Sequence, residues 1–247
     1  MIMKNADHEE QKQGLDYLSK IYSYDRRPAS TYPDQLAKYL NKKFIRKKEA
    51  KFLDVGCGRG DMLRAFQKIN FSVFGLDLSS EAKKLCDPID VQHVNLEEEN
   101  FQYSENNFDV IFSKSLIEHL KKPINFMKSC KKLISPEGSL IIMTPSWVHH
   151  SWGPFYLDHT HCSPFTLQSL RDLAYLSGFK EVKVEYIYQL PFLWKFGFLK
   201  PLSKIVAMLK IPYMPMYEGL TWIRWPNSIN KFLRFSNEVM LIAVCKK

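Results

Sequence analysis

The chain has 247 residues, of which 45% are hydrophobic and 25% charged, and its formal net charge is +9 at pH 7. This composition is typical of a globular protein and excludes a disordered or fibrous chain. The length favours one large domain, residues 1–247. The five cysteines are scattered without CxxC spacing. We therefore expect reduced thiols, no structural zinc and a cytoplasmic location.

The N-terminal part, residues 1–48, starts with a polar segment that does not resemble a signal peptide. Apolar residues then recur at helical spacing over 36–44. We predict that residues 1–48 form a helical cap ahead of the first strand. No run of 18 apolar residues follows anywhere in the chain, so no membrane-spanning helix is expected.

Short apolar segments that are often β-branched predict seven strands. They cover residues 51–56, 72–77, 91–96, 108–113, 139–144, 180–188 and 238–245. Helical patterns lie between them at 62–69, 124–133 and 167–176. This alternation predicts an α/β fold, a doubly wound and mostly parallel seven-stranded sheet with helices on both faces. The last two strands lack an ordinary crossover, so we expect an antiparallel last strand, inserted in the sheet and preceded by a helical insertion.

A glycine-rich turn follows the first predicted strand, in the stretch FLDVGCGRGDML (52–63). Its glycines form GxGxG, whereas the dinucleotide fingerprint is GxGxxG and a triphosphate loop requires GxxxxGK[ST]. Asp54 and Asp61 place two carboxylates around the turn. Such a turn suits a cationic or zwitterionic ligand better than a pyrophosphate.

Polar residues also follow the next strands of the predicted sheet. Asp77 ends the second strand about 20 residues after the glycines, a spacing at which a carboxylate accepts both hydroxyls of a ribose. Asn95 ends the third strand. Because ligands of such sheets bind at the carboxyl ends of the strands, we expect these side chains to share one site with the glycine turn.

The stretches LDVGCGRGDML, VFGLDLS, VNLEEENFQYSENNFDVIFSKSLIEHL and LKKLISPEGSLIIMTP together resemble class I S-adenosylmethionine-dependent methyltransferases. The resemblance covers roughly residues 50 to 145 and extends to the group that methylates small molecules, quinones and glycans. It implies S-adenosyl-L-methionine as the cofactor. The residues it assigns to cofactor binding are Asp54, Gly56, Cys57, Gly58, Asp77, Leu78, Asn95, Leu96 and Ser113.

Each assigned residue has an implied role. Asp54 would lie near the amino group of the cofactor, and Asp77 would bind its ribose. Asn95, which stands where the family often has aspartate, would contact the adenine amino group, and Leu96 would supply a backbone contact to the ring. Ser113 would lie beside the methionine portion. The backbone around the glycines would allow that portion to approach closely.

Methyl transfer to a hydroxyl is helped by a general base. Five of the seven histidines fall within residues 119–161, and histidine titrates near the working pH. We favour His161 as the base, then His119, with Asp158 as a further catalytic candidate. The alternative for any single histidine is a surface or capping role.

Some quinone O-methyltransferases of this group resemble SExxEH after strand four, where two glutamates and a histidine hold a divalent ion. Here Ser115 stands where the first glutamate would be. We therefore predict no metal, and expect Glu118 and His119 to orient the helix start or line the pocket. The [DN]PP[YF] motif of enzymes that methylate base amines is missing, so nucleic acid is not an expected substrate.

Residues 189–236 form a basic, aromatic insertion before the last strand. They hold seven Lys and Arg against one Glu, so 7 − 1 = +6 of the net charge falls here. We interpret the insertion as a lid over the acceptor pocket, with membrane contact and a dimer contact as alternatives. The predicted function is methyl transfer to an oxygen of a small-molecule, glycan or lipid-linked acceptor. The alternative is an RNA-binding or non-catalytic protein of the same fold.

Overall fold

A computed structural model describes residues 17–19, 22–97, 101, 103–209, 211–217 and 225–247. The part of the expected N-terminal cap at 1–16 lies outside the described residues, as do Lys210 and 218–224 of the insertion. Among the described residues, none of the helices combines the length and the apolar character needed to cross a bilayer.

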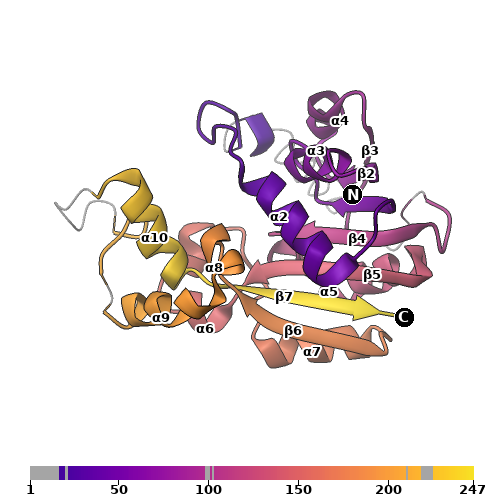
Figure 1. The fold of residues 1–247 in the computed structure, drawn as a ribbon. Helices are drawn as coiled ribbons and strands as arrows, with labels where there is room; N and C mark the ends of the chain where they lie inside the picture. The colour runs from indigo at the N-terminus through magenta and orange to yellow at the C-terminus, as the bar shows by residue number, and fades with distance from the viewer. Residues whose placement is uncertain (1–16, 20–21, 98–100, 102, 210, 218–224) are drawn as a thin grey trace, which may run out of the picture.

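The core of the molecule is one seven-stranded sheet with the order β3-β2-β1-β4-β5-β7-β6 (Figure 1). The neighbouring pairs among β1 to β5 are parallel, and β7 is antiparallel to both β5 and β6. The strands are β1 Lys51–Val55, β2 Ser72–Asp77, β3 Asp90–His93, β4 Phe108–Lys114, β5 Ile134–Pro145, β6 Glu181–Ile187 and β7 Met240–Lys246. The predicted fold class and the inserted antiparallel last strand are confirmed.

Two strand boundaries differ from the prediction by more than two residues. β3 ends at His93, so Asn95 and Leu96 lie in the turn that follows it rather than in the strand. β5 begins at Ile134, directly after a helix, because the residues before Gly138 already pair with β4. Periodicity could not mark either boundary, since Val94 and Leu96 continue the apolar pattern beyond β3, whereas the polar segment 135–138 at the start of β5 has the composition of a turn.

Helices cover both faces of the sheet. They are α2 Tyr32–Leu40, α3 Asp61–Gln67, α4 Ser80–Cys86, α5 Pro123–Leu133, α6 Trp147–His150, α7 Leu167–Leu176, α8 Pro191–Lys195, α9 Lys200–Met208 and α10 Asn227–Asn237. α2 continues as a π-helical turn, Asn41–Ile45. α2, α3 and α4 pack in one buried cluster with the sheet, and α5 and α7 pack in the other.

Alternation along the strands explains why both clusters are apolar. Phe52 faces the α2–α3 side and Leu53 the α5–α7 side, and Ile141 and Ile142 divide in the same way. Strands that are buried on both faces therefore have nearly continuous apolar sequences. The ring centroids of Phe52 and Phe66 are 3.8 Å apart, so the first strand and α3 are held together by an aromatic stack just behind the glycine turn.

The insertion lies beyond the carboxyl ends of β4 and β5, where α8, α9 and α10 gather (Figure 1). α8 is fixed to α2 by Trp194, whose ring stacks on Tyr39 with centroids 4.8 Å apart. The indole nitrogen of Trp194 donates a hydrogen bond to the carbonyl of Tyr188 at 2.8 Å. α9 and α10 enclose a small core of their own around Val206, Tyr213 and Leu233.

Candidate active site

The glycine turn adopts the backbone conformation that glycine favours. Gly56 has φ +81°, and a Cβ on it would lie 3.2 Å from a Leu116 side-chain atom. Gly60 has φ +74°, and a Cβ there would lie 2.6 Å from the Cys86 sulfur. The N–H groups of Gly56 and Cys57 both donate to the Leu76 carbonyl, at 2.8 and 3.1 Å. β1, the turn and β2 therefore form one rigid unit.

Asp77 lies at the end of β2, beside this turn. One carboxylate oxygen accepts the N–H of Gly58 and the other accepts the N–H of Ser79, both at 2.8 Å. Burial raises the pKa of Asp77, while these backbone donors oppose the rise. Each oxygen makes one such bond and retains a second lone pair for a ligand hydroxyl. The carboxylate is thus held beside the glycine turn, and its role in binding a ribose stays a prediction.

Asp54 is buried at the end of β1, with 4% of its surface exposed. Burial raises its pKa well above the usual value, and the neighbouring Cys86, Asp77 and Asp61 add to the rise, whereas Lys114 opposes it. A positively charged ligand group beside Asp54 would reverse this penalty. The residue therefore fits a cofactor that carries an ammonium and a sulfonium.

The remaining predicted cofactor residues lie at the same edge of the sheet. Ser113 is buried at the end of β4, and its hydroxyl oxygen has no hydrogen-bond partner. Leu78 directly follows Asp77, and Leu96 is buried in the turn after β3. Asn95 accepts the N–H of Glu97 through its side-chain oxygen at 3.2 Å. An orphaned buried hydroxyl, an oriented carboxylate and a close-approach turn fit S-adenosylmethionine.

Two contributors near the site were missed by the sequence interpretation. Lys114 ends β4 between Asp54 and Glu118, and burial lowers its pKa while both carboxyls oppose the shift. Leu18 is buried, with a side-chain carbon 3.6 Å from the Cβ position of Gly58. Lys114 could have been found from the sequence, because it follows Ser113 at the end of a predicted strand. Leu18 could not, because its position depends on tertiary packing.

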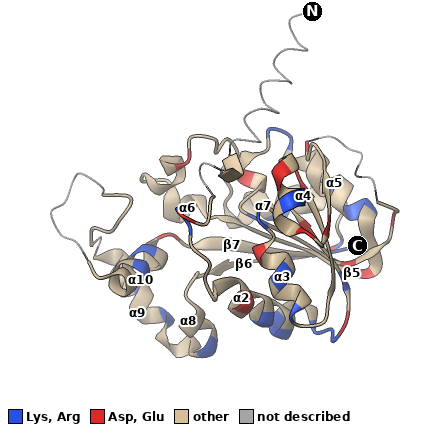
Figure 2. Cartoon of the chain, turned by 90° about the horizontal axis from the view of Figure 1, so that it is seen from above, with Lys and Arg blue, Asp and Glu red and all other residues tan. Residues whose placement is uncertain are grey.

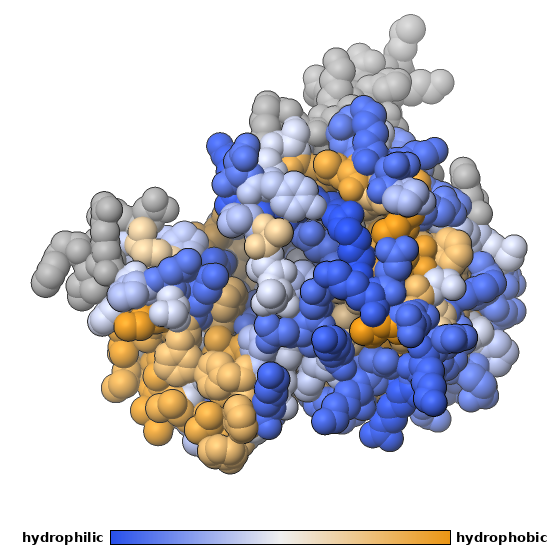
Figure 3. All heavy atoms as spheres, turned by 45° about the horizontal axis from the view of Figure 1, so that its top comes forward, coloured by the Kyte–Doolittle hydropathy of each residue, from blue (hydrophilic) through white to orange (hydrophobic). Residues whose placement is uncertain are grey.

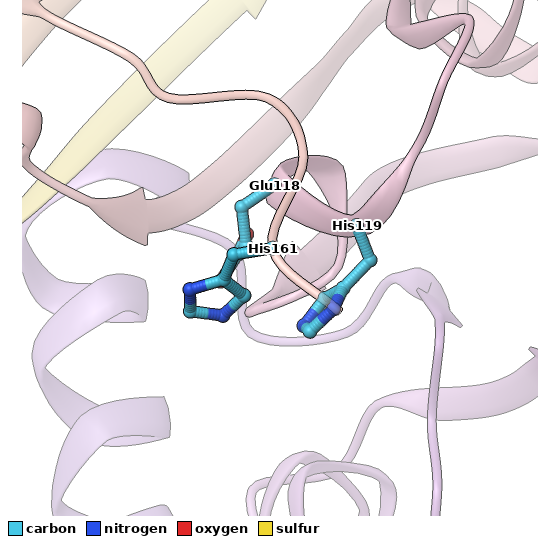
Figure 4. Close-up of side chains that lie close together, drawn as sticks. All are labelled: Glu118, His119 and His161. Carbon is cyan, nitrogen blue, oxygen red and sulfur yellow. The ribbon is translucent and has the colours of Figure 1, made fainter. Parts of the chain in front are cut away.

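The predicted catalytic residues come together where the loop after β5 meets the turn after β4. Two backbone N–H groups, those of Cys162 and Ser163, donate to the Glu118 carbonyl at 2.9 Å each. These bonds fix the loop against the short 3₁₀ turn Ile117–His119. As a result the imidazole rings of His119 and His161 lie with centroids 4.6 Å apart (Figure 4).

Hydrogen bonds define the tautomer of each ring. The Nδ1 of His161 lies 2.6 Å from the Phe155 carbonyl, which can only accept, so Nδ1 carries the proton. The Thr160 hydroxyl donates to Asp158 at 2.6 Å, so it accepts from the Nδ1 of His119 at 2.7 Å. Each neutral ring therefore presents Nε2 as its basic atom. Asp158 is linked to His119 by hydrogen bonds through Thr160, whereas its effect on His161 is electrostatic.

Burial lowers the pKa of His161. Burial also lowers the pKa of His119 to about 4, and the neighbouring His161 adds to this shift. Both rings are thus neutral at neutral pH. Two other histidines of this region, His149 and His150, hydrogen-bond to the Ser146 hydroxyl and carbonyl. They lie within α6 and have structural partners there, outside the group formed by His119 and His161.

Glu118 is fully buried beneath these rings. Its Oε2 accepts the Thr144 hydroxyl at 2.9 Å, and its Oε1 has no partner. Burial raises the pKa of Glu118 to about 7, which Lys114 and the Thr144 hydrogen bond partly offset. The carboxyl is therefore divided between its neutral and charged forms near neutral pH.

Glu118, His119 and His161 bring one ligand atom each within 4.8 Å of one another. Two histidines and one carboxylate are a donor set for zinc or ferrous iron. The prediction of no metal depended on Ser115, and His161 brings a third possible ligand side chain from another part of the chain. The absence of a metal stays a prediction.

Comparison with known proteins supports the family. A family model described as a methyltransferase domain matches residues 24–184. A ubiquinone biosynthesis O-methyltransferase of Actinobacillus pleuropneumoniae is 30% identical over 165 residues, 58% of this chain and 66% of that protein. One of Histophilus somni is 32% identical over 117 residues, 42% and 49% of the two chains. The chain thus spans between about half and two thirds of these relatives.

Solved structures share the fold. A methyltransferase of Archaeoglobus fulgidus superposes with a TM-score of 0.61 at 18% identity, covering 92% of this chain and 98% of that one. Phosphoethanolamine N-methyltransferase 2 of Haemonchus contortus, in complex with S-adenosyl-L-methionine, gives 0.62 at 18% identity, with 94% and 59% covered. With the family match and the geometry of the strand ends, this chain belongs to the class I S-adenosylmethionine-dependent methyltransferases.

Proposed function

We propose that the protein methylates a hydroxyl oxygen of a small molecule. The observation that carries the proposal is His161, a neutral histidine whose Nδ1–H is bound by Phe155 and whose Nε2 is therefore the basic atom. It lies on the loop that follows β5, at the carboxyl end of the sheet where Asp77 and the glycine turn lie. Such a base speeds the attack of a hydroxyl on a methyl group.

The bound cofactor would supply an activated methyl group on sulfur. The acceptor oxygen would take this methyl group, S-adenosylhomocysteine would leave, and His161 Nε2 would accept the proton that the hydroxyl loses. The imidazolium that forms is stabilised by Asp158, which contributes favourably to the charged state of His161. Alignment of the reacting groups can supply roughly 7–11 kcal/mol of the barrier.

The surroundings of His161 favour an aromatic acceptor. The ring centroids of Phe155 and His161 are 4.6 Å apart, and the Trp147 ring meets Phe155 at 5.4 Å. Tyr156 and Leu157 remain exposed beside them. The relatives named for ubiquinone biosynthesis suggest a phenolic hydroxyl on a molecule with an apolar tail. Among the acceptor classes expected from the sequence, this supports a lipid-linked phenol over a glycan.

The proposal is tested with S-adenosylmethionine that carries an isotopically labelled methyl group. Purified protein is incubated with prenylated catechols and with matched compounds in which an amine replaces the hydroxyl. We expect labelled methyl ethers from the catechols only, identified by mass spectrometry. Label on the amine compounds alone, or none on any acceptor while the protein binds the cofactor product, would contradict O-methylation.

A further inference from the structure

Helix α9 of the insertion has an unusual arrangement of its apolar residues. Its inward face packs on α10 through Val206, and Ser203 is buried beside it. Its outward face carries Leu202, Ile205 and Met208, exposed by 49%, 54% and 80%. Residues at i, i+3 and i+6 share one helical face, so these side chains form a continuous stripe. The larger apolar side chains of α9 therefore face outward.

The stripe continues into the turn before α9. Phe198 is 77% exposed, Phe196 is 49% exposed, and the ring centroids of the two are 6.2 Å apart. Leu209 extends the stripe at the other end of α9, with 64% exposed. Figure 3 shows this apolar surface as a protruding end of a molecule whose same face is otherwise largely hydrophilic. We call residues Phe196, Phe198, Leu202, Ile205, Met208 and Leu209 the apolar ridge.

Lysines flank the apolar ridge. Lys195, Lys200 and Lys204 are exposed beside it, and α8, α9 and α10 all carry basic residues (Figure 2). The sequence has no acidic residue between Glu185 and Glu218. None of the three lysines has an acidic partner among the described residues. A second protein surface would have to neutralise these charges one by one, whereas an anionic bilayer does so without a specific geometry.

The insertion is built to hold this surface rigidly at the catalytic end. Trp194 fixes α8 to α2, and Trp152, on the segment that leads to the His161 loop, meets Tyr213 and Tyr217 at 6.2 Å each. The small core around Val206 holds α9 in place. The apolar ridge is thus the outer side of a packed unit that adjoins the loop carrying His161.

We propose that the apolar ridge docks on the surface of an anionic phospholipid bilayer. Phe196, Phe198 and the α9 stripe would enter the boundary between headgroups and acyl chains, and the three lysines would meet lipid phosphates. The helix would lie in the interface. If the proposed function holds, docking places the active site where an acceptor with an apolar tail is concentrated; the docking itself does not depend on it.

Sedimentation with vesicles tests the proposal. The probes are vesicles of three parts phosphatidylcholine to one part phosphatidylglycerol, and vesicles of phosphatidylcholine alone, with intact protein at low and high salt. We expect binding to the anionic vesicles that weakens at high salt, where the screening length falls to about 3 Å at 1 M. Replacing Lys195, Lys200 and Lys204 by Gln should weaken partitioning on the order of 100-fold, since each charge contributes about a factor of five.

Two control variants distinguish binding through the apolar ridge from nonspecific adsorption to lipid. The combined changes Leu202→Gln, Ile205→Gln and Met208→Gln should abolish sedimentation, whereas Leu176→Gln, at a 72% exposed position on α7, should not. Lys42→Gln with Lys48→Gln, on the basic surface next to α2, is the charge control. Unchanged thermal midpoints and cofactor affinity show that each variant is folded.

Three outcomes would overturn the proposal. Protein that stays in the supernatant with anionic vesicles at low salt shows that no docking occurs. If the ridge variant and the Leu176 or Lys42 control lose vesicle binding to the same extent, binding is not through the apolar ridge. Sedimentation velocity that detects a dimer of the protein alone, broken by the ridge variant, assigns the surface to self-association. Failure of methyl transfer with intact vesicle binding would count against the proposed function only.

Discussion

The cofactor side and the acceptor side of the molecule are built in different ways. On the cofactor side, the glycine turn and Asp77 are fixed by backbone hydrogen bonds within residues 54–79. On the acceptor side, His119 and His161 are brought together from segments 42 positions apart (161 − 119), and the insertion adds a third segment. The cofactor side is a local unit, and its backbone hydrogen bonds leave little room for a different geometry. The second is assembled from loops, so the acceptor can vary while the cofactor stays the same.

The largest expected effect lies on the acceptor side. His161→Ala should lower turnover roughly 10²- to 10⁴-fold, because the acceptor hydroxyl loses its base. Affinity for S-adenosylhomocysteine should be unchanged, since the two sides are separate. His149→Ala is the matched control, a histidine of the same region whose ring hydrogen-bonds to the Ser146 hydroxyl. Steady-state kinetics and calorimetry measure both quantities, and equal turnover in the two variants would remove His161 from the mechanism.

The next effect concerns the stability of the acceptor side. Burial raises the pKa of Glu118 from 4.5 to about 7, so the native state holds a proton that the unfolded state releases between those values. The stabilisation that this proton provides is fully present below pH 4.5, and it is lost as the pH rises toward 7. Linkage gives a loss of about 3 kcal/mol over this interval.

Glu118→Gln removes that titration. Urea denaturation of both proteins from pH 4.5 to 8 should therefore show the variant gaining about 3 kcal/mol relative to wild type as the pH rises. Parallel stability curves would mean that the Glu118 carboxyl is not held neutral in the native state.

The smallest expected effect is that of a chelator. We expect EDTA treatment to leave turnover unchanged, because His161 acts as a base in the proposed function. The test distinguishes a base from a metal ligand, since the His161 ring is also one of three side chains that could hold a metal ion. Loss of turnover that zinc or manganese restores would instead make Glu118, His119 and His161 a metal centre, and would reassign His161 from base to ligand.

The sequence predicted the fold of the cofactor side because the signals for its strands and turn are local. The strand, the turn and the aspartate about 20 residues later are fixed by chain geometry. The same reasoning selected His161 and His119, but it could not show that their Nδ1 atoms are occupied by Phe155 and Thr160, since those contacts depend on the fold of the loop. Ser115 led to a prediction of no metal because a ligand distant in sequence cannot be read from a short motif.

The insertion shows the opposite limit. Its charge and aromatic content were apparent, yet only the packing of Val206 against α10 reveals which side of α9 faces outward. The N-terminal cap was predicted as a helix, but the contact of Leu18 with the glycine turn was not. Composition identifies such segments, and tertiary packing decides what they contact.

The central claim is that the strand ends around Asp77 form a site for S-adenosylmethionine, and calorimetry with S-adenosylhomocysteine tests it most directly. We expect micromolar binding, about −8 kcal/mol. Asp77→Ala should weaken it by about 1.5–3 kcal/mol, the range for hydrogen bonds to a charged group. Asp109→Ala is the control, because this carboxylate bonds Lys47 and the Lys51 N–H at the other end of β4. Wild-type affinity in Asp77→Ala, or no binding by the intact protein, would contradict the account.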